Sequence, residues 1–111
     1  MYKTDIMEAI LILTSFPEEK GALRLAKQLI DQHKAACVHI GSQLTSIYHW
    51  KGKTETATEV PVVIKTLSAH YAAVEQTIKA LHPYELPEII AVPIIKGLPA
   101  YLQWIADETV H

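Results

Sequence analysis

The chain has 111 residues and a mass of 12.4 kDa, and half of its residues are apolar, which predicts one compact domain over residues 1–111. Twelve acidic against ten basic residues give a net charge of −2, so the composition excludes the basic footprint of a nucleic-acid-binding protein. The single cysteine excludes an internal disulfide, and no apolar run reaches the roughly 18 residues of a membrane span. We therefore expect a cytoplasmic location, with neither a nucleic acid nor a membrane as a partner.

The first third of the chain predicts a strand followed by a helix. Residues 9–13 (AILIL) form a short apolar run that favours a buried strand. Residues 15–18 (SFPE) have the pattern of a capping box that begins a helix. The expected apolar face of this helix consists of Ala22, Ala26, Leu29 and Ile30. Lys34 is expected to close the helix, because its C-terminus favours positive charge.

The middle of the chain predicts a long β-hairpin. Residues 35–50 have extended character with a bend at Gly41, residues 51–53 (KGK) predict a tight turn, and residues 54–66 predict the returning strand. Because Pro61 has no N–H to donate, we expect an edge or a bulge there. These strands exceed the usual length of roughly 3–10 residues, so we expect the hairpin to project and to pair with another copy of the chain.

The last part predicts a helix, a strand and a second, shorter helix. Ser68 is expected to cap the first of these helices, and Pro83 is expected to end it. Its apolar stripe is Tyr71, Val74, Ile78 and Leu81. Residues 88–94 predict a strand and residues 98–105 a C-terminal helix. The order β-α-β-β-α-β is that of a ferredoxin-like α+β sandwich, here with a long central hairpin and an extra C-terminal helix.

Histidines and the cysteine are the first candidates for metal binding. The six histidines are His33, His39, His49, His70, His82 and His111. Cys37 and His39 share one face of a strand and could form half of a soft metal site, but a cysteine packed beside an ordinary histidine is the more common arrangement. No histidine pair has the helical i, i+4 spacing of a zinc enzyme, and neither a nucleophile elbow nor a phosphate-binding glycine loop is present. We therefore expect no enzymatic activity.

Residues 82–88 (HPYELPE) form the loop that most resembles a binding site, because two prolines stiffen a segment with a histidine, a phenol and two carboxylates. A helix end followed by a strand entry would explain the same residues equally well. We predict a cleft between subunits that is lined by Tyr84, Glu88 and Lys65. We also predict weak Cu²⁺ or Zn²⁺ binding by His82 and Glu88, with no obligatory cofactor and with Cys37 buried and a poor ligand.

Several stretches of the chain resemble the CutA divalent-cation tolerance proteins. They are residues 35–38 (AACV), 45–53 (TSIYHWKGK), 59–66 (EVPVVIKT), 82–90 (HPYELPEII) and 101–105 (YLQWI). The resemblance implies a ferredoxin-like subunit of a stable cytoplasmic homotrimer, with an architecture similar to the PII signalling proteins. It also implies a role in tolerance of copper and other divalent cations.

The metal sites proposed in that family use a cysteine at the end of the first strand, a histidine before the HPY-like motif and the final glutamate of that motif. The corresponding positions here hold Leu13, Leu81 and Glu88. The chain is thus expected to be a trimeric, non-enzymatic metal-response protein. Two alternatives stay open: a PII-like sensor that binds a small anion or a nucleotide in clefts between subunits, and an anchoring module that displays other proteins.

Overall fold

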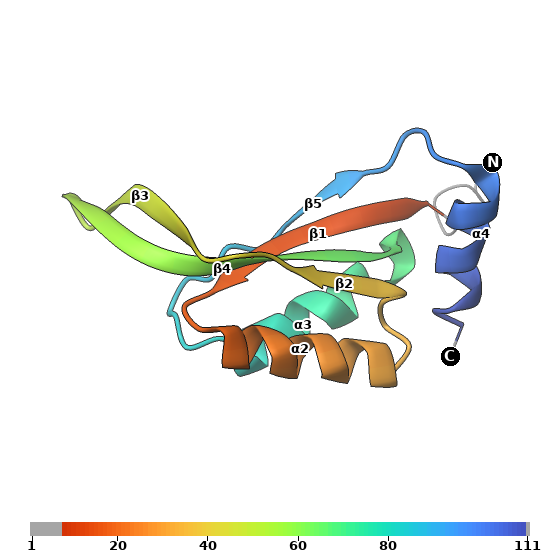
Figure 1. Cartoon of the computed structure of the whole chain (residues 1–111), viewed down its shortest axis with the longest axis horizontal. Coiled ribbons are helices and arrows are strands. Elements are labelled where there is room, and N and C mark those ends of the chain that lie inside the picture. The colour runs from red at the N-terminus through yellow and green to blue at the C-terminus, as the bar shows by residue number, and fades with distance from the viewer. Residues whose placement is uncertain (1–7, 111) are drawn as a thin grey trace.

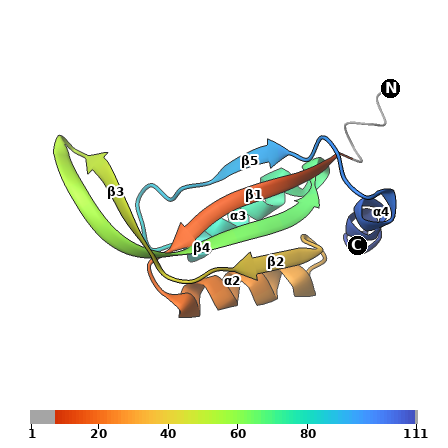
Figure 2. The same ribbon diagram turned by 45° about the horizontal axis from the view of Figure 1, so that its top comes forward.

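The computed structural model describes residues 8–110, and Figures 1 and 2 show a sheet with two helices on one face and a hairpin that extends beyond it. The elements are β1 (Ala9–Phe16), α2 (Glu19–Asp31), β2 (Cys37–Ile40), β3 (Leu44–Trp50), β4 (Lys53–Leu67), the 3₁₀ turn η1 (Ser68–His70), α3 (Tyr71–Leu81), β5 (Ile90–Pro93) and α4 (Pro99–Asp107). The antiparallel sheet has the order β2-β4-β1-β5, and β3 pairs with β4 beyond the end of β2. The predicted ferredoxin-like α+β fold is confirmed, including its long hairpin and C-terminal helix.

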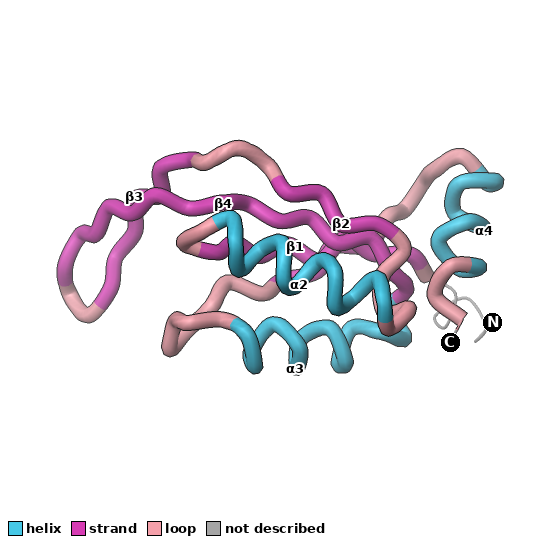
Figure 3. Tube along the Cα trace, turned by 60° about the horizontal axis from the view of Figure 1, so that its bottom comes forward, coloured by secondary structure: helices cyan, strands magenta, loops and turns pink. Residues whose placement is uncertain are grey.

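One face of the sheet packs against α2 and α3, which lie side by side (Figure 3). Ile12 of β1 pairs in register with Ile64 of β4, and both side chains are fully buried. The same core includes four fully buried helix residues, Leu25, Leu29, Val74 and Ile78. The predicted stripe of α3 is confirmed, whereas on α2 the predicted Ile30 is exposed and Leu25 is buried in its place.

The opposite side of the sheet, which we call the open face, has an apolar centre, and no helix of residues 8–110 crosses that centre. Its paired residues are Leu11 with Val92, and Leu13 with both Val63 and Ile90. Ile90 and Val92 are exposed, and the other three are half-buried. The helix α4 covers only one end of the sheet, where it packs on residues near the start of β1 and the end of β4. Residues 8–110 by themselves therefore leave this apolar surface uncovered.

The hairpin consists of β3 and the first half of β4, and it has no buried side chain from residue 44 to residue 58. The tight turn predicted at residues 51–53 is confirmed, although Lys53 already belongs to β4. Lys51 and Gly52 both have positive φ values, 51° and 82°, as a type I′ turn needs. Ile47, near the tip, is 71% exposed. An isolated two-stranded ribbon of this kind is marginally stable at best, so its stability depends on further contacts.

The bend at Gly41 and the proline in β4 belong to one feature. The Gly41 N–H donates to the Pro61 carbonyl at 2.9 Å, and a Cβ on Gly41 would lie 2.9 Å from Pro61 Cγ. Because N–H and C=O of one strand residue point to the same side, the missing N–H of Pro61 faces the interruption between β2 and β3. The edge expected at Pro61 is therefore limited to this interruption. Elsewhere in the sheet, β4 is a central strand that pairs with β1 on one side and with β2 on the other.

Three predicted helix ends are wrong. The capping box is not formed, because β1 continues through Phe16 and the residue at the N-cap of α2, Glu18, makes no side-chain capping bond. Lys34 lies beyond the end of α2, which closes through backbone hydrogen bonds around His33, whose φ is 57°. Ser68 begins the 3₁₀ turn η1 and caps no helix with its side chain.

Candidate functional site

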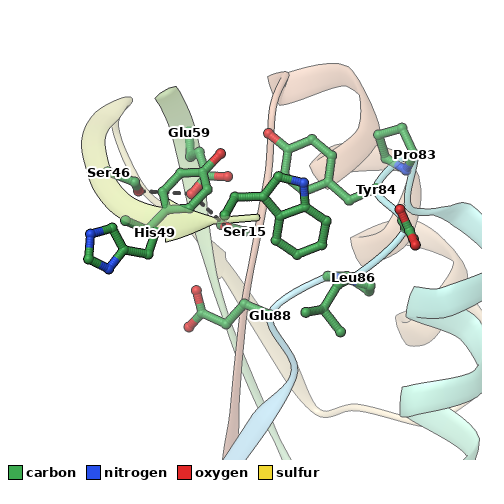
Figure 4. A pocket seen from close by; sticks show the side chains of 12 residues that line it. Ser15, Ser46, His49, Glu59, Pro83, Tyr84, Leu86 and Glu88 are labelled. Carbon is green, nitrogen blue, oxygen red and sulfur yellow. Dashed lines mark hydrogen bonds between the residues drawn. The ribbon is translucent and has the colours of Figure 1, made fainter. Parts of the chain in front are cut away.

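A pocket of about 750 Å³ lies where the hairpin leaves the sheet, between the hairpin and the loop of residues 83–88 (Figure 4). The strands line it with Ser15, Ser46, Tyr48, His49, Trp50 and Glu59, and the loop lines it with Pro83, Tyr84, Glu85, Leu86, Pro87 and Glu88. No lysine or arginine of residues 8–110 is among the lining residues. Three carboxylates therefore give the pocket an acidic lining.

Glu59 is the buried polar centre of this pocket, with 8% of its surface exposed. Its Oε1 accepts a hydrogen bond from Ser46 Oγ at 2.8 Å and another from Ser15 Oγ at 3.3 Å (Figure 4). Within the described part of the chain, no cationic side chain forms an ion pair with Glu59. The two hydroxyl groups orient the carboxylate, but they leave its buried charge without a counter-ion.

Tyr84 contributes a phenol to the same pocket and keeps 36% of its surface exposed. Partial burial raises the pKa of Tyr84 above its ordinary value of 10.0. The negative charge of Glu59, a side-chain hydrogen bond to Glu59 and the nearby Tyr48 raise this pKa further. The phenol is therefore held in its neutral form, in which it can donate a hydrogen bond.

Aromatic rings and a lysine surround the outer part of the pocket. Trp50 is half-buried, and the Lys51 ammonium lies 5.5 Å from the centroid of its ring. Lys51 also forms an ion pair with Glu85 at 3.9 Å, and both side chains are largely exposed. The His49 imidazole points away from Glu59 in Figure 4. The rim thus already holds one ammonium group against an aromatic ring. Glu59 lies deeper and has no cationic partner among the described residues.

His82, a predicted metal ligand, does not line the pocket but holds its loop in place. The ring is 9% exposed, with Nε2 2.6 Å from the Ser15 carbonyl and Nδ1 accepting the Tyr84 backbone N–H at 3.1 Å. Because Nδ1 accepts, the proton lies on Nε2, which donates to the carbonyl. The imidazole also contacts the rings of Phe16 and Tyr84, at centroid distances of 4.5 and 4.8 Å. Both ring nitrogens are therefore already in use.

The predicted cleft residues are only partly brought together within one chain. Tyr84 and Glu88 line the pocket, whereas Lys65 lies elsewhere and donates to the Tyr101 hydroxyl at 3.1 Å. The Lys65 ammonium is also 5.2 Å from the centroid of the Tyr101 ring. A cleft between subunits that would combine all three residues stays a prediction, as does the pairing of His82 with Glu88 on a metal ion.

The other candidate ligands do not converge. Cys37 and His39 share a strand face as predicted, since they pair with Lys65 and Val63, but Cys37 is only half-buried and was expected to be buried. Among residues 8–110, no group of three histidine, cysteine, aspartate or glutamate side chains could hold a metal ion. Leu13 and Leu81, which stand at the two altered positions of the proposed family site, are half-buried, and His111 lies outside the described residues.

Sequence reasoning missed Glu59, Ser15 and Ser46 as parts of a site. Ser15 was interpreted as a helix cap, and its actual partner Glu59 is 44 positions away in the sequence. One signal could have identified Glu59: it is an acidic residue at the boundary between the polar residues 53–58 and the apolar residues 60–64 of one strand. A carboxylate next to a buried run needs partners, and these can be sought on neighbouring strands.

Comparison with known proteins places this architecture in context. The sequence profile described as "CutA1 divalent ion tolerance protein" matches residues 10–108. The "Divalent-cation tolerance protein CutA" of Thermus thermophilus is 40% identical over 103 residues, which cover 93% of this chain and 99% of that protein. The "Protein CutA homolog" of Xenopus laevis is 44% identical over 91 residues, which cover 82% of this chain and 60% of that protein. For "Protein CutA" of Mus musculus the identity is 43%, and this chain spans about half (52%) of its length.

Solved structures agree with the fold. The "stable protein, CutA1" of the psychrotrophic bacterium Shewanella sp. SIB1 superposes with a TM-score of 0.89 at 45% identity, covering 92% of this chain and 95% of that one. A structure from Archaeoglobus fulgidus, called a periplasmic divalent cation tolerance protein, has a TM-score of 0.88 at 38% identity, with coverage of 92% and 99%. Separately, none of the helices in residues 8–110 is long and apolar enough to span a bilayer.

Proposed function

The chain belongs to the CutA1 divalent ion tolerance family of non-enzymatic proteins, and we propose that it acts as a homotrimer that responds to divalent metal ions by binding them weakly. The observation that carries this proposal is the acidic pocket lined by Glu59, Glu85 and Glu88. His82 lies outside this lining and contacts the ring of the lining residue Tyr84. Negative charge in a concave site attracts cations and repels anions. The pocket of one chain therefore favours a cation over the small anion or nucleotide of a PII-like sensor.

The contacts of His82 support weak rather than tight binding. To ligate a metal ion, the imidazole has to give up its hydrogen bond to the Ser15 carbonyl or the one from the Tyr84 N–H. Leaving such a buried group without its hydrogen bond costs about 1–3 kcal/mol, and this cost makes the free energy of metal binding less favourable. With Glu88 as the second ligand, the coordination sphere would be completed by water or by a neighbouring chain.

Two uncovered surfaces support the trimer. The open face presents exposed Ile90 and Val92, and the hairpin presents Ile47 and Tyr48 near its tip. Apolar and aromatic groups of this kind characterise the centres of protein interfaces. The free edges of the hairpin also offer backbone donors and acceptors to a further strand. Assembly through the hairpin and the open face would bury these surfaces.

We place the protein in the cytoplasm. Its one cysteine, Cys37, is free, as is usual in a reducing compartment. The relative from Archaeoglobus fulgidus is called periplasmic, which makes the periplasm the alternative location. Cell fractionation followed by detection of the untagged chain decides between the two compartments.

Calorimetric titration with Cu²⁺ and Zn²⁺ tests metal binding. We expect weak, saturable binding to the wild type, its loss in His82→Gln and Glu88→Gln, and its retention in Cys37→Ser. His70→Ala is the matched control, because it removes an imidazole of η1 that does not line the pocket. The proposal fails if Cys37→Ser abolishes binding while His82→Gln does not. Parallel titrations with nucleotides test the sensor alternative, and light scattering that reports a monomer at micromolar concentration would reject the trimer.

A further inference from the structure

We propose that the pocket between the hairpin and residues 83–88 binds an organic ammonium ion, such as a short primary alkylamine. Glu59 would be its counter-ion, and the aromatic rings of Tyr48, Trp50 and Tyr84 would form its walls. This inference goes beyond metal tolerance and does not depend on it, because it uses neither His82 nor a metal ion.

The buried charge of Glu59 is the first argument. A buried carboxylate is stable when it is hydrogen-bonded and paired with a positive group. The hydroxyls of Ser15 and Ser46 both donate to one oxygen, Oε1, and no cation of the described residues pairs with the carboxylate. An alkylammonium group would supply the missing positive charge and up to three N–H donors. The ammonium group would join these hydroxyls as the one charged partner of the carboxylate.

The aromatic walls are the second argument. The faces of tryptophan and tyrosine rings attract cations, and the attraction increases when water is excluded. Trp50 already does this at the rim, where the Lys51 ammonium lies 5.5 Å from its ring centroid. Lys51 is held there by Glu85, so it does not neutralise Glu59. A second ammonium group, carried by a ligand, would find both a ring and a carboxylate deeper in the pocket.

The shape of the pocket suits an organic cation better than it suits a tightly bound metal ion, and this agrees with the weak metal binding proposed above. The volume of about 750 Å³ lies within the usual range for small-molecule pockets. A metal ion needs several ligands at short distances, and no group of three potential ligands converges among residues 8–110. Glu59 is the buried carboxylate of a pocket that also has aromatic walls and two rim carboxylates, Glu85 and Glu88. This combination suits a large, weakly hydrated cation with an alkyl chain.

The test is a titration of the assembled protein with n-butylammonium chloride in the presence of a metal chelator. In a Trp104→Phe background, Trp50 is the only tryptophan and reports on the pocket by its fluorescence. We expect saturable quenching by butylammonium and none by n-butanol, which has the same chain without the charge. Glu59→Gln keeps the shape and the hydroxyl partners, and it should weaken binding by at least about tenfold.

Two further variants keep the test decisive if Glu59→Gln affects folding. Glu85→Gln removes the same charge from the rim and should change affinity less than about threefold, since exposed charges contribute little. Trp50→Leu, followed by calorimetry, should weaken binding because the ring face is lost. The proposal is overturned if the wild type binds no butylammonium. A lysine of a neighbouring subunit that filled the pocket would give this result. Equal affinities of Glu59→Gln and Glu85→Gln would also overturn it.

Discussion

The two halves of β4 belong to one strand but lie in different surroundings. From Val60 to Thr66, alternate side chains are buried against α2 and α3, whereas none is buried from Lys53 to Thr58. The first of these segments is stabilised by apolar burial within the chain. In the described sheet, the second segment pairs with β3 on one side. This difference is the physical argument for the proposed assembly, in which surfaces of other copies would cover the hairpin.

The largest expected effect is on the free energy of unfolding, and it compares an isoleucine-to-alanine change in the buried half of β4 with the same change in the hairpin. Ile64→Ala in the buried half should lower the free energy of unfolding by about 2–5 kcal/mol, because it leaves a cavity in the core. Ile47→Ala in the hairpin should cost less, and its effect should increase as the protein is diluted, since association and folding are coupled. Urea unfolding at several protein concentrations measures both. Equal, concentration-independent losses would contradict the comparison.

A charged substitution at the hairpin tests assembly directly. Ile47→Asp should destabilise the association by at least about 2 kcal/mol per contact, because it places a carboxylate in an apolar interface. Multi-angle light scattering should then report the mass of one chain, 12.4 kDa. Ile30→Asp is the control, since it introduces the same charge at an exposed isoleucine on α2. If Ile30→Asp dissociates the protein and Ile47→Asp does not, the interface lies elsewhere.

The next effect concerns His82, whose hydrogen bonds connect the loop of residues 83–88 to β1. His82→Phe keeps a ring between Phe16 and Tyr84 but removes both hydrogen bonds of the imidazole. We expect a loss of about 1–3 kcal/mol of stability and faster hydrogen exchange of the Tyr84 amide. Lys27→Phe, at an exposed position of α2, should stay within about 0.5 kcal/mol of wild type. Unchanged exchange at Tyr84 in His82→Phe would show that the loop is held by other contacts.

The smallest expected effect is a loss of folding stability at alkaline pH. Because burial and Glu59 raise the pKa of Tyr84 in the folded state, its contribution is fully present below its ordinary value of 10.0 and is lost as pH rises through the folded pKa. Wild type should therefore lose stability relative to Tyr84→Phe above about pH 10, by less than about 1 kcal/mol for this partly exposed group. Spectrophotometric titration should show that Glu59→Gln lowers the Tyr84 pKa only in part, since burial is the largest cause. A Tyr84 pKa that is the same in both proteins would remove Glu59 as a cause.

Patterns within one element were sufficient to predict most of the fold. The stripe of α3, the turn at residues 51–53 and the returning strand were all predicted from local spacing, and the strand extends one residue further at each end than predicted. Local patterns were less reliable for caps. Ser15 and Ser68 have the residue type of an N-cap, but a serine hydroxyl also bonds elsewhere when a stronger acceptor is near. For Ser15 that acceptor is Glu59, on a strand far away in sequence.

The sequence by itself determined the order of the elements, the tight turn and the presence of a rigid loop at residues 82–88. Periodicity and the conformational limits of proline and glycine act between near neighbours, so they can be followed along the chain. Only the tertiary structure decided that Glu59 is buried beneath that loop, that His82 has no free nitrogen and that Lys65 lies with Tyr101. Each of these outcomes depends on pairing between segments that are dozens of residues apart in the sequence. The register of that pairing decides both which side chains are buried and which hydrogen-bond partners they meet.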